Sequence, residues 1–174
     1  QKRSFKREAF SWIACIVVTI LLTEFILNFV IINANIPSGS MENTIMTNDK
    51  LIALRTSYWF NDPKRGDIII FKYPDDETEW FIKRVIALPG ETVLVKDGKV
   101  YINGSKKALS EPYIKEEPVE DFGPYKVPKN GYFVMGDNRN NSNDAREWET
   151  HYVSRDEVLG KAWFRYYPSI KVIK

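Results

Sequence analysis

The chain begins with an apolar stretch over residues 9–32, and this stretch is followed by a long region of shorter apolar runs. As a helix, residues 9–32 would extend about 36 Å, which is enough to cross the hydrocarbon core of a bilayer with some tilt. The alternative is a cleaved signal peptide. The apolar stretch is longer than usual for such a peptide, and a cut after Ala34 would need Ile32 as the second small residue. We therefore expect one retained transmembrane helix.

From residue 50 onward, short apolar runs bounded by turn residues predict β-strands. The candidates are residues 67–73, 81–87, 92–95, 99–102, 132–135 and 158–167. Residues 92–95 and 99–102 should form a hairpin, because Asp97-Gly98 tolerates the positive φ of a tight primed turn. Residues 104–130 are rich in proline, glycine and charge, and we expect an irregular insertion there. The predicted fold is mainly β, with a mostly antiparallel sheet or barrel-like domain over residues 33–174.

The charge pattern orients the predicted helix. The basic residues Lys2, Arg3, Lys6 and Arg7 precede it, and no lysine or arginine follows until Lys50. The positive-inside rule then places residues 1–8 as a cytoplasmic tail and residues 33–174 outside the cell, so that the protein crosses the cell membrane once. The whole chain carries a formal net charge of +2, and the region after residue 33 is balanced. This argues against a nucleic-acid partner.

Two polar residues interrupt the predicted helix. Glu24 and Asn28 lie four residues apart and therefore on one helical face. A carboxylate inside a membrane is costly, so one hypothesis gives Glu24 a functional or packing role. The other, which we favour, is a neutral Glu24 hydrogen-bonded to Asn28.

The composition offers little for a metal or cofactor. The single cysteine, Cys15, lies inside the apolar stretch, so neither an intramolecular disulfide nor a zinc cluster of cysteines can form. The acidic run over residues 75–79 is interpreted as a solvated loop rather than a metal site. We expect no cofactor.

The most informative residues are Ser40 and Lys83. Lys83 interrupts an apolar strand, and strand alternation places it on one face with Phe81 and Val85. A buried lysine loses its charge more easily, and a neutral amine can take the proton of a serine hydroxyl. The alternative is a lysine at the strand edge whose head reaches solvent.

A third segment supports a site. Residues 136–146 are dense in turn formers and paired charges and follow a predicted strand, so they can form a rigid supporting loop. A calcium-binding loop is the alternative, but its basic residues argue against it. His151 could form a triad with Ser40, but its neighbours give no burial pattern, and we expect a surface histidine.

Together these segments resemble bacterial type I signal peptidases over nearly the whole chain. The matching segments, in order, are the membrane span, Pro37–Met41, Lys64–Ile69, Ile82–Glu91 and Gly136–Arg146. The single span and small outer domain resemble the compact form of Gram-positive bacteria. Lysine rather than histidine at position 83 is typical of the bacterial enzymes.

The resemblance implies a catalytic domain of the kind found in signal peptidases and self-cleaving repressors, and it implies a role for each matching residue. Ser40 would be the nucleophile and Lys83 the general base. The Ser40 N–H and the Ser38 hydroxyl would form the oxyanion hole. Ser142 would orient the Lys83 amine, and Asp144 with Arg146 would brace the loop. The remaining implied residues are Arg84 as support and Ile36, Met41, Ile70 and Ile82 as walls of the substrate pocket.

The implied function is removal of N-terminal signal peptides from exported preproteins after an Ala-X-Ala sequence. The implied partners are those signal peptides, the lipid bilayer and the secretion translocon, with no metal or cofactor. Two alternatives are a self-cleaving regulatory Ser-Lys peptidase and an inactive membrane-anchored β module that acts in an assembly.

The chain departs from the family pattern at two positions. Asn43 stands where the family usually has proline, and either a looser loop or a helix cap could result. Ala145 stands where serine is common, so that hydroxyl is missing. Separately, Tyr58-Trp59-Phe60 fits either a loop dipping into the membrane interface or a packed core, and both hypotheses stay open.

Overall fold

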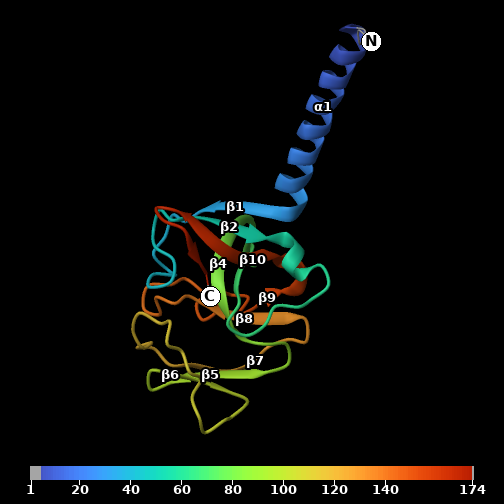
Figure 1. Cartoon of the computed structure of the whole chain (residues 1–174). Coiled ribbons are helices and arrows are strands. Elements are labelled where there is room, and N and C mark those ends of the chain that lie inside the picture. Colours follow the sequence, from blue (N-terminus) through green and yellow to red (C-terminus); the bar gives the residue numbers. More distant parts are fainter. Residues whose placement is uncertain (1–4, 174) are drawn as a thin grey trace.

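The structure, a computed structural model of the chain, describes residues 5–173. Helix α1 (Phe5–Phe25) continues into a π-helical turn, η1 (Ile26–Val30), and projects away from the rest of the molecule (Figure 1). Residues Arg7–Val30 are long and apolar enough to cross a membrane, and none of their most apolar window is buried. Lys2 and Arg3 of the predicted basic tail lie outside the described residues.

The helix ends two residues earlier than predicted. Ile31 and Ile32 begin strand β1 (Ile31–Asn35), where Ile32 pairs with Ala53 and is buried. Isoleucine suits a buried strand at least as well as a helix, so the apolar run alone did not reveal this boundary. Within the helical region, the Asn28 amide donates to the Glu24 carboxylate at 3.1 Å, as the favoured interpretation of this pair requires.

The larger sheet is antiparallel throughout and contains eight strands in the order β1-β2-β10-β3-β4-β8-β9, with β11 added beside β10. Its further strands are β2 (Lys50–Leu54), β3 (Ile68–Tyr73), β4 (Asp76–Ala87), β8 (Gly131–Met135), β9 (Val153–Ser154), β10 (Val158–Tyr167) and β11 (Lys171–Val172). Two 3-10 turns, η2 (Arg55–Tyr58) and η3 (Arg155–Glu157), connect strands of this sheet. The mainly β, mostly antiparallel fold predicted from the sequence is confirmed.

A smaller sheet lies at the end of the molecule farthest from α1 (Figure 1). It contains β5 (Thr92–Lys96), β6 (Lys99–Ile102) and β7 (Phe122–Lys126) in the order β6-β5-β7. The predicted hairpin is confirmed, with φ of 49° at Asp97 and 75° at Gly98. Strand β7 corrects the expectation of an irregular insertion over residues 104–130. Its Gly123-Pro124 pair reads as a turn in sequence, yet the strand pairs with β5.

The acidic run is not a loop. Strand β4 begins at Asp76, so residues 76–79 form an exposed strand end, and Pro74 and Asp75 alone make the turn from β3. The Asp75 carboxylate accepts the backbone N–H groups of Glu149 and Thr150 at 2.9 and 3.0 Å. The turn therefore anchors a distant segment of the chain.

Two buried clusters stabilise the domain. One lies between the two sheets and includes Phe71, Phe133 and Trp148, and the other lies beneath β1, β2 and β10 and includes Met41 and Leu51. The aromatic triplet is divided between the two environments proposed for it. Tyr58 is buried, whereas Trp59 and Phe60 are 53% and 90% exposed.

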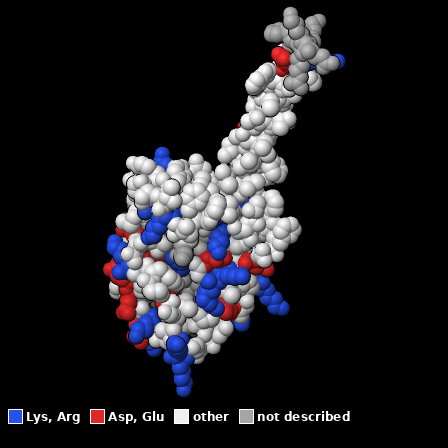
Figure 2. Space-filling model, viewed as in Figure 1, with Lys and Arg blue, Asp and Glu red and all other residues white. Residues whose placement is uncertain are grey.

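Charge is distributed unevenly between helix and domain. Figure 2 shows blue and red side chains intermingled over the domain, whereas the helix is almost free of them below its grey end. This distribution of charge fits a helix that lies in lipid and a domain that lies in water.

Candidate active site

The fold brings Ser40 and Lys83 together. Lys83 lies on β4 and Ser40 lies in the turn after β1, and the Lys83 Nζ is 2.8 Å from the Ser40 Oγ. Ser40 is 7% exposed and Lys83 is 4% exposed, so both are largely shielded from bulk water. The alternative in which the head of Lys83 reaches solvent at a strand edge is wrong.

Burial sets the protonation of the lysine. Desolvation lowers the pKa of Lys83 from 10.5 to about 8, and the Asp144 carboxylate opposes this by favouring the charged form. The ring of Phe81 lies 5.2 Å from the Lys83 Nζ and forms part of its apolar surroundings. A substantial fraction of this amine is neutral near pH 8, as a general base requires.

The turn that carries Ser40 is held in place by backbone hydrogen bonds and by buried apolar side chains. Backbone hydrogen bonds from Glu42 N to Gly39 O and from Ile45 N to Met41 O form the turn. Met41 and Ile45 are both buried in the cluster beneath β1, β2 and β10. The apolar side chains after Ser40 therefore hold the hydroxyl in place beside the lysine.

The segment over residues 136–146 packs directly against this turn. Asn138 donates its backbone N–H to the Ser40 carbonyl at 3.1 Å and its side-chain amide to the Gly39 carbonyl at 3.0 Å. A Cβ at Gly136 would overlap the Ser142 Oγ and the Ser40 carbonyl oxygen, so only glycine fits there.

Asp144 is the centre of that loop. Its carboxylate accepts hydrogen bonds from the Gly136 N–H at 2.9 Å, from the Ser142 hydroxyl at 2.8 Å and from the Arg146 guanidinium at 2.9 and 3.0 Å. The ion pair expected between Asp144 and Arg146 is therefore present. Among the described residues, the Ser142 hydroxyl bonds to Asp144 rather than to the Lys83 amine, so its direct action on the lysine stays a prediction.

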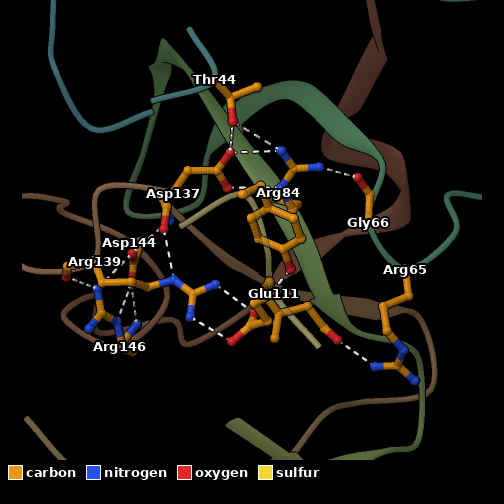
Figure 3. Close-up of polar contacts among 12 residues, drawn as sticks. Thr44, Arg65, Gly66, Arg84, Glu111, Asp137, Arg139, Asp144 and Arg146 are labelled. Atoms are coloured by element: carbon orange, nitrogen blue, oxygen red, sulfur yellow. Dashed lines mark hydrogen bonds and ion pairs between the residues drawn. The ribbon is translucent and has the colours of Figure 1, made fainter. Parts of the chain in front are cut away.

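Adjacent residues of a strand point to opposite faces, so Arg84 lies on the other face of β4 from Lys83. Its polar contacts hold the back of the site together (Figure 3). It donates to both oxygens of Asp137, at 2.8 and 2.7 Å, and to the Gly66 carbonyl at 2.8 Å. The Thr44 hydroxyl also donates to Asp137, and the Tyr113 ring lies 3.8 Å from the Arg84 guanidinium carbon. Sequence reasoning named Arg84 as support but did not identify these partners.

A second buried arginine ties the region 104–130 to the site. Arg139 donates to both oxygens of Glu111, at 2.9 and 2.6 Å, and to the Gly136 carbonyl at 3.0 Å (Figure 3). The Tyr113 hydroxyl donates to the same carboxylate at 3.0 Å. Nothing in the sequence around Glu111 marks it, because its partner lies 28 residues away. Both acidic residues of the supporting loop, Asp137 and Asp144, are paired with arginines.

An open cavity of about 400 Å³, here called the active-site cavity, contains both Ser40 and Lys83. An adjoining cavity of about 230 Å³ runs along β1 and is here called the β1 cavity. The exposed Ser38 lines the active-site cavity, Ile36 and Ile82 line both, and Ile70 lines the β1 cavity. Met41 does not line either cavity, because it is fully buried in the core, which corrects its assignment as a pocket wall.

The departures at positions 43 and 145 have structural consequences. Asn43 adopts φ of 88°, and its side-chain amide donates to the Tyr113 carbonyl at 3.1 Å. The asparagine therefore fixes the loop to the region 104–130 rather than loosening it. Ala145 is fully buried, so bulk solvent does not reach the place of the missing hydroxyl.

His151 does not join Ser40 and Lys83. Its Nδ1 is 2.8 Å from the Ala145 carbonyl, and its ring packs edge-on against Phe122 and Tyr125. The residue is therefore half-buried among aromatic rings rather than on the open surface. It does not line the active-site cavity. Among the described residues, no group of histidine, cysteine, aspartate and glutamate is placed to hold a metal ion.

Comparison with known proteins adds independent support. A family model described as "Signal peptidase, peptidase S26" matches residues 9–167. A probable signal peptidase I-2 of Synechocystis sp. is 44% identical over 161 residues, covering 90% of this chain and 72% of the relative. A signal peptidase I of Bacillus amyloliquefaciens is 34% identical over 184 residues, covering 100% of this chain and 96% of the relative.

A solved structure agrees with this assignment. The crystal structure of a signal peptidase I from Enterococcus faecalis V583 superposes with a TM-score of 0.50 at 36% identity, covering 58% of this chain and 97% of that one. The family match covers most of the helix, the turn that carries Ser40 and the strand that carries Lys83. The chain therefore belongs to the signal peptidase family, peptidase S26.

Proposed function

We propose that this protein is a membrane-anchored endopeptidase that removes signal peptides from exported preproteins by means of a Ser40–Lys83 dyad. The observation that carries the proposal is the 2.8 Å contact between a buried lysine amine, with a pKa lowered to about 8, and a serine hydroxyl that opens into a cavity. A serine hydroxyl needs such a partner before it becomes an effective nucleophile.

The geometry supports the following reaction. The Ser40 Oγ attacks the scissile carbonyl carbon while its proton passes to the neutral Lys83 Nζ. The resulting oxyanion accepts hydrogen bonds from the Ser40 N–H and the Ser38 hydroxyl, which are aimed at charge that develops only in the transition state. The protonated Lys83 then gives its proton to the leaving amine, and an acyl-enzyme remains. Water attacks this ester with Lys83 again acting as base, and Ser40 is restored.

The cavity lining supports selection of small residues before the scissile bond. In an extended peptide, alternate side chains point the same way, so the two alanines of Ala-X-Ala can enter the active-site and β1 cavities together. The walls contributed by Ile36, Ile70 and Ile82 are apolar and branched. Such walls favour an apolar side chain such as alanine over a polar or charged one, which would lose its hydration there.

The helix supports a location at the cell membrane. Residues 9–30 would span the bilayer, residues 1–8 would face the cytoplasm and the β-rich domain would lie outside. Strand β1 follows the helix directly and leads to Ser40 within about one strand length, so the site lies close to the bilayer surface. A preprotein emerging from the secretion translocon would reach the site from the membrane side.

The test is cleavage of a preprotein with an Ala-X-Ala site by the purified full chain in detergent micelles. We expect the wild type to cut at that site, and Ser40→Ala and Lys83→Ala to lose cleavage. Lys72→Ala is the matched control, because Lys72 lies on neighbouring β3 in an exposed ion pair with Glu77. A wild type that does not cut, or a Lys83→Ala variant that cuts equally well, would contradict the dyad.

A further inference from the structure

A third open cavity continues from the active site on the side away from β1. It has a volume of about 510 Å³, is formed largely by residues 139–147 and is here called the loop cavity. It shares Asn141 and Asn143 with the active-site cavity. The β1 cavity shares other lining residues with the active-site cavity, and it shares no lining residue with the loop cavity. The three cavities therefore lie in a row, with Ser40 and Lys83 in the middle one.

This order gives a bound peptide a direction. The β1 cavity is lined from Ile32 onward, where the strand leaves the helix, so it is the membrane end of the row. If the proposed function holds, the signal peptide comes from the membrane and occupies the β1 and active-site cavities up to the scissile bond. The chain that follows the bond must then leave over Asn141 and Asn143 into the loop cavity.

The far wall of the loop cavity is held rigidly. The Asn140 side chain accepts the Val119 N–H at 2.9 Å and donates to the Glu117 carbonyl at 3.0 Å. These two bonds fasten residues 117–119 to the supporting loop and fix the position of the adjoining Glu120, which lines the cavity with Val119. The cavity is thus built from two segments that are bonded to each other.

The open face of this cavity is acidic. Its two arginines are already neutralised, since Arg139 is paired with Glu111 and Arg146 with Asp144. Glu120 and Glu147 also line the cavity and are exposed, and neither has an ion pair among the described residues. The charge presented to a bound peptide is therefore negative.

We propose that the loop cavity is the subsite for the first residues after the scissile bond, and that Glu120 and Glu147 make it prefer lysine or arginine over aspartate or glutamate there. This inference rests on the proposed function and adds a substrate preference on the mature side of the bond. The carboxylates attract a cationic side chain and repel an anionic one in a partly solvated site.

The test compares two preproteins that are identical through the scissile bond and carry either three lysines or three glutamates directly after it. For the wild-type full chain, we expect kcat/KM to favour the lysine substrate by about fivefold at low salt, a size typical of partly exposed charge pairs. The ratio should shrink as added salt screens the charges. In the double variant Glu120→Gln/Glu147→Gln, the ratio should fall close to one. Glu116→Gln, an exposed residue outside all three cavities, should keep the wild-type ratio.

Binding to the Ser40→Ala variant separates this inference from the proposed function. The dissociation constants of the two uncut preproteins, measured by fluorescence anisotropy, should show the same preference, which should disappear when Glu120→Gln/Glu147→Gln is added. Absence of wild-type cleavage with a retained binding preference would contradict the proposed function alone. A wild-type ratio near one in binding and cleavage, or a ratio unchanged in the double glutamine variant, would overturn the inference.

Discussion

The Arg84 guanidinium donates to both carboxylate oxygens of Asp137, at 2.8 and 2.7 Å. Arg84 directly follows Lys83 on β4, and Asp137 lies at the start of the loop that packs against the Ser40 turn. The pair therefore links the strand of the proposed base to the loop behind the proposed nucleophile. The side chains are 2% and 0% exposed, so neither charge can turn to water if its partner is removed.

Asp137→Asn should destabilise the protein strongly, because it leaves the buried Arg84 charge without compensation. We expect a loss of roughly 3–5 kcal/mol of unfolding free energy, as is typical when one partner of a buried pair is removed. Thermal unfolding of the full chain in detergent micelles measures it. Glu77→Gln breaks the exposed pair with Lys72 and should cost no more than about 1 kcal/mol. If the two variants lost the same unfolding free energy, burial would not determine how much the Arg84–Asp137 pair contributes to stability.

The pH dependence of cleavage should report the protonation of Lys83. Only the neutral amine can accept the Ser40 proton, and burial lowers the pKa of Lys83 to about 8. The value of kcat/KM should therefore level off above pH 8 and fall about tenfold per pH unit well below it. Initial rates on a signal-peptide substrate between pH 6 and 9.5 measure this profile. A profile without an acidic decline would contradict a lysine base.

Asp144→Asn should shift that acidic decline to lower pH. The Asp144 carboxylate favours the charged lysine and so raises the pKa of Lys83, against the larger lowering by burial. Its removal lets the pKa fall further, so more of the amine is neutral at a given pH. The midpoint of the profile distinguishes this effect from loss of loop structure, which would lower the rate at every pH. A midpoint that stays at the same pH or moves to higher pH would contradict the prediction that Asp144 raises the pKa of Lys83.

Several features of the fold and of the site could be predicted from local sequence. Lys83 lies within an apolar strand, and the two-residue period of that strand places it on an apolar face, which indicated burial with an exposed strand edge as the alternative. The Asp97-Gly98 hairpin likewise follows from turn chemistry. These predictions hold because each depends on residues that are close together in the chain.

Other features depend on contacts that no local pattern encodes. The Glu111–Arg139 pair joins residues 28 apart, and its members look like ordinary surface charges in sequence. Strand β7 contains Gly123-Pro124, which signals a turn, and only pairing with β5 makes it a strand. Ile31 and Ile32 suit helix and strand alike, so pairing with β2 decides the boundary. In each case the tertiary partner overrides the local preference.

Lys83→Met should make the protein more stable while abolishing cleavage. The pKa of Lys83 is about 8 in the folded state against 10.5 for an ordinary lysine, so the unfolded chain binds the proton more tightly. By linkage, this lysine destabilises the fold fully below pH 8, and the effect declines as the pH rises from 8 to 10.5. The shift corresponds to about 3 kcal/mol, or roughly 6–12 °C in unfolding temperature at pH 7. Thermal unfolding of the variant and the wild type at pH 7 tests the gain in stability, and the same measurement at pH 10 tests whether that gain becomes smaller. A variant less stable than wild type at pH 7 would contradict the cost assigned to the buried amine.

Asn43→Pro should damage both stability and cleavage, although proline is usual at this position in the family. Asn43 has φ of 88°, whereas proline fixes φ near −65°, so the turn behind Ser40 cannot keep its shape. The change also removes the amide that bonds to the Tyr113 carbonyl. We expect a cost of about 1–3 kcal/mol from the backbone and a lower kcat, because the Ser40 hydroxyl moves relative to Lys83.

Asn43→Gly is the matched control for the backbone effect. Glycine adopts positive φ freely, so this variant loses only the side-chain hydrogen bonds, worth roughly 0.5–1.5 kcal/mol. It should keep a kcat close to wild type, and thermal unfolding together with initial rates on one substrate separates the two variants. Wild-type kcat and stability in Asn43→Pro would show that the turn adopts a negative φ at residue 43 and that the asparagine is not required to hold the loop in place. A loss of kcat in Asn43→Gly as large as in Asn43→Pro would assign the effect to the Tyr113 contact instead of the backbone.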